Sequence, residues 1–224
     1  MLCNTNSIYK YTDLFYNISI FVNEVMRMSY LKKLEKLIKQ KNGTLLTSDL
    51  KELNIPRIYL SKLVDVGKLE RVSRGVYVTP DAIEDEMYYM QCKYPKIIYS
   101  HETALFLHGL TDRTPFEYSA TVPSSYKVVE NISENFKIYY IKNELHNLGI
   151  TDGKTSFGNK IKLYNVERTI CDIVRSRNKI DIQIVNEALK RYVKLKSADY
   201  ALLIEYAKKF KVEKLLKNYM EVLL

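Results

Sequence analysis

The region between residues 56 and 79 restricts the fold most strongly, because it holds three elements in very little chain. A helix over residues 56–66 is predicted by apolar residues at the spacing of one helix face, and Gly67 provides its end. This face consists of Leu60, Leu63, Val64 and Gly67. Two strands are predicted at residues 68–72 and 76–79, joined by Ser73-Arg74-Gly75, where glycine permits a positive φ. A helix followed so closely by a hairpin indicates a small, tightly turned domain.

Two more helices are predicted in the residues that precede this region. A first helix ends at Asn42-Gly43, and its apolar stripe consists of Leu31, Leu34, Leu37 and Ile38. A short second helix follows, for which Thr47 or Ser48 is the expected cap, and residues 54–56 make a turn. The order helix, helix, turn, helix, hairpin is that of a winged helix-turn-helix, which we place at residues 29–80.

The positive charge of the chain is concentrated in the same residues. The 224 residues carry a formal net charge of +9, of which residues 29–80 contribute +6 and residues 81–224 contribute +3. A basic excess permits a polyanionic partner. Its position on a predicted winged helix-turn-helix favours double-stranded DNA as that partner.

The outward face of the third helix and the wing supply the candidate DNA contacts. We expect Arg57, near the start of the helix, to reach guanine N7 and O6, and Lys62 to reach a base edge or a phosphate. Arg71 and Arg74 lie at the wing, where contacts to the backbone or the minor groove are typical. The complete candidate set is Arg57, Tyr59, Ser61, Lys62, Arg71 and Arg74.

The first 28 residues differ in composition from the rest and form a predicted N-terminal extension. Thr12 is a possible cap for a helix whose single apolar stripe consists of Leu14, Phe15, Ile18, Phe21, Val22, Val25 and Met26. We expect an additional helix here that packs on its own domain or on a partner. Met26 and Met28 are alternative start sites, which leaves open the possibility that this segment is not part of the native chain.

Residues 81–224 are predicted to form an α+β domain. Short strands are expected at residues 96–99 and at the alternating patterns Phe116–Val122, Phe136–Tyr140 and Lys160–Leu163. From Asn165 onward the apolar spacing is helical and predicts three or four C-terminal helices. The fold class of the whole chain is therefore α+β: a winged helix-turn-helix followed by a small mixed sheet with C-terminal helices.

The polar residues of the second domain favour structural roles over catalysis. His101 and His108 are seven residues apart, about 10 Å along a helix, which is too far for one metal ion. Ser100 is expected to cap a helix, and Arg168 to pair with Asp172. Asp112 and Arg113 are expected to form a local ion pair or to brace a loop. No glycine-rich phosphate loop or nucleophile elbow is present. We therefore expect no catalytic residues, metal or cofactor, and the three distant cysteines are expected to be free thiols.

The C-terminal helices are rich in lysine. The candidate surface for a second partner consists of Lys190, Lys194, Lys208, Lys211 and Lys214. A solvated helix face explains these lysines equally simply, so the sequence leaves both interpretations open.

Three segments resemble the AbiEi-family antitoxins. Residues 60–77 resemble their N-terminal winged helix, while Ser100–Leu110 with Asp112-Arg113, and Glu167–Ile173, resemble their second domain. The resemblance covers residues 29–224. It implies a type IV toxin–antitoxin system of abortive phage defence, in which the antitoxin represses its own operon at inverted repeats. It also implies a nucleotidyltransferase-like toxin that the C-terminal domain counters without a stable blocking complex.

Two other functions are compatible with the same pattern. One is a winged-helix regulator with a ligand-sensing second domain. The other is a nuclease-like or modifying second domain that uses His101, Glu102, Asp112 and Asp172. No run of apolar residues is long enough for a membrane helix and the N-terminus lacks the features of a signal peptide, so we expect a cytoplasmic protein.

Overall fold

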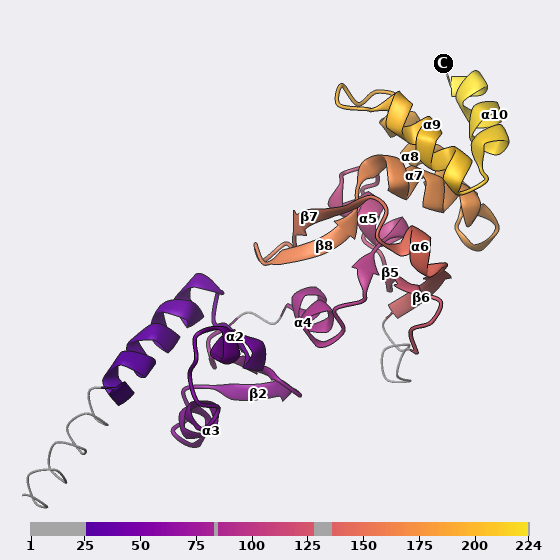
Figure 1. Ribbon diagram of the computed structural model, residues 1–224. Helices are drawn as coiled ribbons and strands as arrows, with labels where there is room; N and C mark the ends of the chain where they lie inside the picture. The colour runs from indigo at the N-terminus through magenta and orange to yellow at the C-terminus, as the bar shows by residue number, and fades with distance from the viewer. Residues whose placement is uncertain (1–25, 83–84, 128–135, 224) are drawn as a thin grey trace, which may run out of the picture. The chain divides into compact units, whose positions relative to one another are not determined.

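A computed structural model describes residues 26–82, 85–127 and 136–223 (Figure 1). The chain divides into two compact units, Met1–Glu84 and Asp85–Leu224, called here the N-terminal and C-terminal units. Most of the helix predicted between Thr12 and Met26 lies outside the described residues. Among the described residues, no helix is long and apolar enough to cross a membrane.

The N-terminal unit contains four helical or strand elements before its wing and two strands within it. A helix over residues 26–40 is followed by β1 (Thr44–Leu46), α2 (Thr47–Glu52), α3 (Ile58–Asp65), β2 (Glu70–Ser73) and β3 (Val76–Val78). The three strands form an antiparallel sheet in the order β1-β3-β2. This is the element order of a winged helix-turn-helix. Strand β1 was not predicted from the sequence, because its three residues show no period.

The start of α2 differs from the prediction. Thr47 is the first helical residue, and neither it nor Ser48 is the cap. The N-cap is Leu46, whose N–H donates to the Asp49 carboxylate at 2.8 Å. Lys41 Nζ lies 2.6 Å from the same carboxylate, so Asp49 connects the first turn of α2 to the end of the preceding helix.

The predicted buried face of α3 is largely confirmed. Leu60 and Leu63 are buried in one cluster with Leu34, Leu45 and Leu50. Gly67, placed on that face by its spacing, is exposed and lies beyond the helix, where its φ of 70° reverses the chain. The helix itself begins at Ile58, two residues later than predicted.

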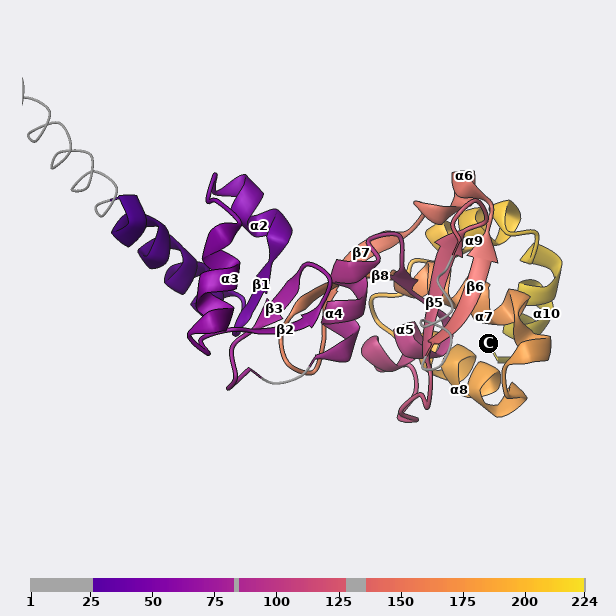
Figure 2. The same ribbon diagram turned by 90° about the horizontal axis from the view of Figure 1, so that it is seen from below.

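The C-terminal unit is built on a mixed five-stranded sheet. Its strands are β4 (Ile98–Tyr99), β5 (Tyr118–Pro123), β6 (Phe136–Ile141), β7 (Ile150–Lys154) and β8 (Lys160–Tyr164), in the order β6-β5-β4-β8-β7. Strands β5 and β6 pair in parallel (Figure 2), as do β4 and β8, and the other two pairs are antiparallel. Phe116, predicted to lie in a half-buried strand, precedes β5 and is fully exposed.

Helices complete the C-terminal unit. They are α4 (Glu86–Lys93), α5 (His101–Leu107), α6 (Asn143–His146), α7 (Val166–Arg175), η2 (Arg177–Lys179), α8 (Ile182–Tyr192), α9 (Tyr200–Lys209) and α10 (Glu213–Leu223). Helices α7–α10 gather at one side of the sheet in both views (Figures 1 and 2). Their apolar faces form one buried cluster, and α7 lies at its centre, with Ile170, Cys171, Ile173 and Val174 fully buried. The predicted α+β fold with C-terminal helices is confirmed.

Candidate functional site

The outward face of α3 carries the candidate base-reading residues. Leu60 and Leu63 anchor the opposite face in the core, and this fixes Ser61 and Lys62 outward, where both are exposed. Arg57 is exposed at the N-cap position of α3. Ile58 is also 55% exposed, so the first turn of α3 presents an apolar side chain beside cationic and hydroxyl groups.

Tyr59 differs from its neighbours because part of its ring is used for packing. Its ring meets that of Tyr30 edge-on, with 5.4 Å between centroids and 70° between planes. Lys62 Nζ lies 5.7 Å from the Tyr59 ring centroid. Tyr59 is half-buried, so it braces α3 against the helix over residues 26–40 and leaves only part of its side chain outward.

The wing is a short turn between β2 and β3. Arg71 and Arg74 are exposed, and the Arg71 Nε donates to the Ser73 carbonyl at 3.4 Å. Gly75 has a φ of 83°, and its carbonyl accepts from the Thr47 N–H at 2.9 Å. This backbone bond connects the wing turn to the start of α2, so the position of the arginines follows that of the helices.

The cations of α3 and the wing have few internal counter-charges. Within the part of the chain that the structure describes, Arg57, Lys62, Arg71 and Arg74 form no ion pair with a carboxylate. Their charge is therefore available to an anionic partner. The structure brings the predicted residues of α3 and of the wing together on one small unit.

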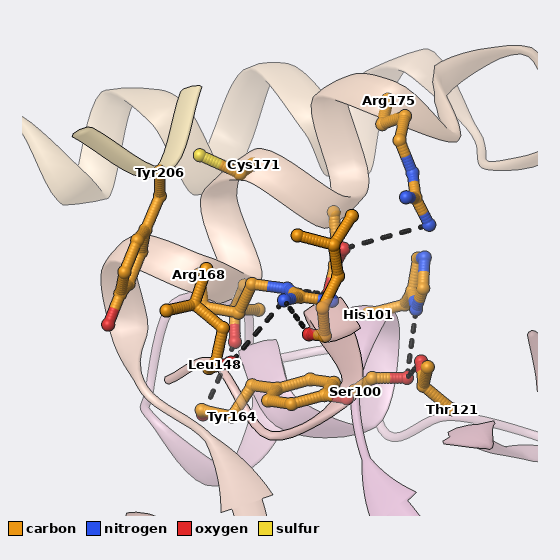
Figure 3. Close-up of polar contacts among 12 residues, drawn as sticks. Ser100, His101, Thr121, Leu148, Tyr164, Arg168, Cys171, Arg175 and Tyr206 are labelled. Atoms are coloured by element: carbon orange, nitrogen blue, oxygen red, sulfur yellow. Dashed lines mark hydrogen bonds and ion pairs between the residues drawn. The ribbon is translucent and has the colours of Figure 1, made fainter. Parts of the chain in front are cut away.

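In the C-terminal unit, the histidine that a catalytic hypothesis would use lies in a buried polar cluster (Figure 3). His101 Nδ1 lies 2.9 Å from Ser100 Oγ, and Nε2 lies 3.1 Å from Ser176 Oγ. Ser100 occupies the N-cap position of α5, as predicted, but its hydroxyl makes no capping hydrogen bond and instead accepts from Thr121 at 2.8 Å. The imidazole stacks on Tyr139 with 3.5 Å between ring centroids.

Burial determines the chemistry of His101. Its side chain is fully buried and its backbone has a φ of 47°, which is unusual for a residue other than glycine. Desolvation, reinforced by the positive charges of Arg175, Arg168 and Lys137, holds the pKa of His101 well below its usual value. The imidazole is therefore neutral and removed from solvent, and these properties suit a structural role.

The predicted pair between Arg168 and Asp172 is confirmed. The two groups are four residues apart on α7, and Nε donates to the carboxylate at 2.9 Å with both side chains buried. The Arg168 guanidinium also donates to the Leu145 carbonyl at 3.0 Å and stacks on Phe210, 3.7 Å from the ring centroid. Burial raises the pKa of Asp172, and Arg168 opposes this shift. A carboxylate so enclosed has no access to an external substrate.

The other acidic residues of the nuclease-like hypothesis are engaged by basic side chains. The sequence predicted a local ion pair between Asp112 and Arg113 as one of two alternatives, but Asp112 pairs instead with Arg191 of α8. This contact lowers the pKa of Asp112. Arg113 instead contacts Asp181 at 3.1 Å. Glu102 lies 3.7 Å from Lys137. No group of three or more histidine, cysteine or acidic side chains suited to a metal ion occurs among the described residues.

The five lysines of the predicted partner surface are all exposed. They do not share one site. Lys211 and Lys214 line one open pocket of about 430 Å³, and the pocket also holds Arg175 and Arg177. The sequence analysis missed these two arginines. The available signal was the basic run at residues 175–179, which immediately follows the apolar stripe of α7.

Comparison with known proteins finds one family match within the N-terminal unit. Residues 32–80 match the family model described as "Transcriptional regulator, AbiEi antitoxin". The resemblance to the AbiEi antitoxins is confirmed over this segment. The matched segment contains α2, α3 and both strands of the wing.

Two further comparisons concern curated proteins and solved structures. No curated protein matches the chain. Among solved structures, the crystal structure of the RV2827C protein from Mycobacterium tuberculosis aligns with a TM-score of 0.48 and 11% sequence identity. That alignment covers 84% of this chain and 78% of the other.

Proposed function

We propose that this chain is a non-enzymatic DNA-binding autorepressor and antitoxin that acts in the cytoplasm. Residues 29–80 form its DNA-binding domain, residues 81–224 its antitoxin domain, and its operator contains inverted repeats. The observation that carries the proposal is the exposed cationic surface of α3 and the wing. Its cations form no ion pair with a carboxylate among the described residues. Such a surface is suited to the major groove and the flanking phosphates.

Each DNA-binding residue has a distinct role in this proposal. Arg57 and Lys62 contact base edges from the first turns of α3, with Ser61 between them. Arg71 and Arg74 neutralise phosphates or enter the minor groove from the wing. Tyr59 supports α3 through its contact with Tyr30 and contributes its outward edge.

The antitoxin role is assigned to the C-terminal unit. We take the nucleotidyltransferase-like toxin from the family resemblance and expect a functional rather than a stable complex. The exposed lysines of α8–α10 are the candidate residues that counter it: Lys190, Lys194, Lys208, Lys211 and Lys214. The burial of His101 and Asp172 supports a mechanism without catalysis by the antitoxin.

The decisive experiment separates the two roles with matched variants of the full chain. An Arg57→Ala/Lys62→Ala/Arg74→Ala variant is compared with a Lys190→Ala/Lys194→Ala/Lys208→Ala variant, which loses the same charge from the other unit. The first should lose operator binding in gel shifts and repression of a reporter, yet still rescue cells that express a cognate nucleotidyltransferase-like toxin. The second should retain full repression. Unchanged operator binding in the first variant would overturn the proposal.

A further inference from the structure

A basic pocket in the C-terminal unit is formed where α7, η2 and the start of α10 meet. It has a volume of about 430 Å³, within the range of small-molecule sites. Four cationic side chains line it: Arg175, Arg177, Lys211 and Lys214. Its remaining lining is apolar or amide, and no carboxylate lines it.

The grouping of four cations in one pocket distinguishes it from the surrounding lysine-rich surface. On the neighbouring helix faces, Lys209 lies 2.7 Å from Glu205 and Lys217 lies 3.8 Å from Glu221. By contrast, Arg177, Lys211 and Lys214 have no ion pair among the described residues. Lys190 and Lys194 of α8 are also without an ion pair among the described residues, so the distinguishing feature of Arg177, Lys211 and Lys214 is that they line one pocket together with Arg175.

The remaining cation, Arg175, is only weakly neutralised. Its guanidinium lies 3.9 Å from the Asp172 carboxylate, which already accepts from Arg168 at 2.9 Å (Figure 3). Asp172 is thus shared between two arginines and cannot balance the pocket. Four converging positive charges repel one another, and an anion that enters the pocket removes this repulsion.

Two of the four cations are constrained by the fold. The Arg175 side chain is 30% exposed and its guanidinium lies 5.7 Å from the Phe210 ring centroid. Lys211 has a left-handed backbone with a φ of 58° and lies between the buried residues Phe210 and Val212. The Arg175 side chain and the backbone of Lys211 are therefore positioned before a ligand arrives, which reduces part of the entropy cost of binding.

We propose that this pocket binds the polyphosphate group of a small phosphorylated ligand of the nucleoside-triphosphate class. Guanidinium groups bind phosphate oxygens in pairs and lysines add point charges. Four cations exceed what a single phosphate requires and suit a chain of phosphates. This assignment is independent of DNA binding by the N-terminal unit, because none of the residues that line the pocket belongs to that unit.

Isothermal titration calorimetry of the full chain with inorganic tripolyphosphate, ATP and GTP tests the assignment. A Lys211→Ala/Lys214→Ala variant is compared with Lys208→Ala/Lys209→Ala, which removes the same charge from adjacent positions outside the pocket. We expect saturable binding of tripolyphosphate that weakens by at least about tenfold in the first variant, because charge-assisted hydrogen bonds are lost. The second variant should bind within about twofold of the original chain, because exposed charges contribute little.

A further variant, Lys214→Glu, tests whether a loss of binding is caused by misfolding. Lys214→Glu reverses a pocket charge while placing an acidic residue in the first turn of α10, where it stabilises the helix. It should melt at an unchanged or higher temperature and lose tripolyphosphate binding. Equal affinities in the pocket and control variants would overturn the proposal. So would pocket-dependent binding of DNA or RNA oligonucleotides without any binding of tripolyphosphate or nucleotides.

Discussion

The guanidinium of Arg168 and the carboxylate of Asp172 form a fully buried ion pair, with 2.9 Å between Nε and the carboxylate. Arg168 lies between two aromatic rings, 4.3 Å from the centroid of Tyr164 and 3.7 Å from that of Phe210. The Arg168 side chain on α7 therefore contacts both strand β8 and the segment that follows α9. This pair organises the packing of the C-terminal unit.

Removing the carboxylate should leave Arg168 as an uncompensated buried charge. We expect Asp172→Ala to lower the free energy of unfolding by about 3–5 kcal/mol, measured by urea denaturation. The control Lys209→Ala breaks an exposed pair at the same i, i+4 spacing. It should cost less than about 0.5 kcal/mol. A loss of similar size in both variants would contradict the structural role of the buried pair.

The neutral, buried His101 makes stability depend on pH. Its pKa is lowered in the folded chain by burial, while the unfolded value is 6.5. Below that pH the unfolded state binds a proton that the folded state does not, so stability is present above pH 6.5 and falls as pH decreases. The contribution to the slope is about 1.4 kcal/mol per pH unit.

The control for this prediction is His101→Asn, because asparagine tolerates a positive φ and does not titrate. Urea denaturation at pH 5.5 and 7.5 should show a smaller pH effect in the variant. The difference between the two chains isolates His101 from His108, whose pKa is also lowered by burial. Identical pH effects would show that His101 protonates in the folded state.

Asp49, rather than Thr47 or Ser48, should determine the stability of the α2 start. Its carboxylate accepts from the Leu46 N–H and pairs with Lys41, and the side chain is nearly buried. We expect Asp49→Ala to cost about 1–2 kcal/mol of unfolding free energy. The exposed Ser48→Ala should cost less than about 0.5 kcal/mol. The reverse order in thermal melts would restore the capping role that the sequence indicated.

This cap illustrates what periodicity predicts well and what it misses. Leu60 and Leu63 recur at helical spacing, so the buried face of α3 follows from the sequence alone. The cap depends on Leu46, the residue at which strand β1 ends and α2 begins. A strand of three residues carries no measurable period, so the sequence did not indicate it. Gly67 follows the end of the helix as predicted, but it is exposed instead of lying on the buried face, because helical spacing alone does not show that a glycine is packed.

Long-range pairing accounts for the other errors. Asp112 and Arg113 are neighbours in sequence, but their charges are satisfied by Arg191 and Asp181, far along the chain. The i, i+4 pair of Arg168 and Asp172 was predictable because a helix fixes its geometry. By contrast, no sequence pattern could place Arg175 beside Lys211, because η2, α8, α9 and their connections separate them.

Arg74 at the wing turn should govern the salt dependence of DNA binding. A phosphate contact releases counterions, so Arg74→Ala should weaken binding to all sequences and reduce the slope of log K against log salt by about 1. Fluorescence anisotropy measured over about 50 to 200 mM salt gives this slope. Arg113→Ala, an exposed and ion-paired arginine of the other unit, is the control and should leave the slope unchanged.

Ile58 should read thymine through its methyl group. It is 55% exposed in the first turn of α3, beside Arg57, where an apolar side chain gains nothing from solvent. In the major groove the C5 methyl of thymine is the apolar feature that distinguishes it. We expect that replacing the contacted thymine with deoxyuridine weakens operator binding by about 0.8 kcal/mol, the value of one buried methyl-sized group.

A double-mutant cycle distinguishes this contact from a general loss of binding. Ile58→Ala should bind thymine and deoxyuridine operators equally, because the partner of the methyl group is gone. Val66→Ala, which removes a similarly exposed apolar side chain just past the end of α3, should retain the full preference for thymine. If Ile58→Ala retains the same preference, Ile58 does not contact the methyl group, and the orientation proposed for α3 in the groove is wrong even if Arg57 and Lys62 bind DNA.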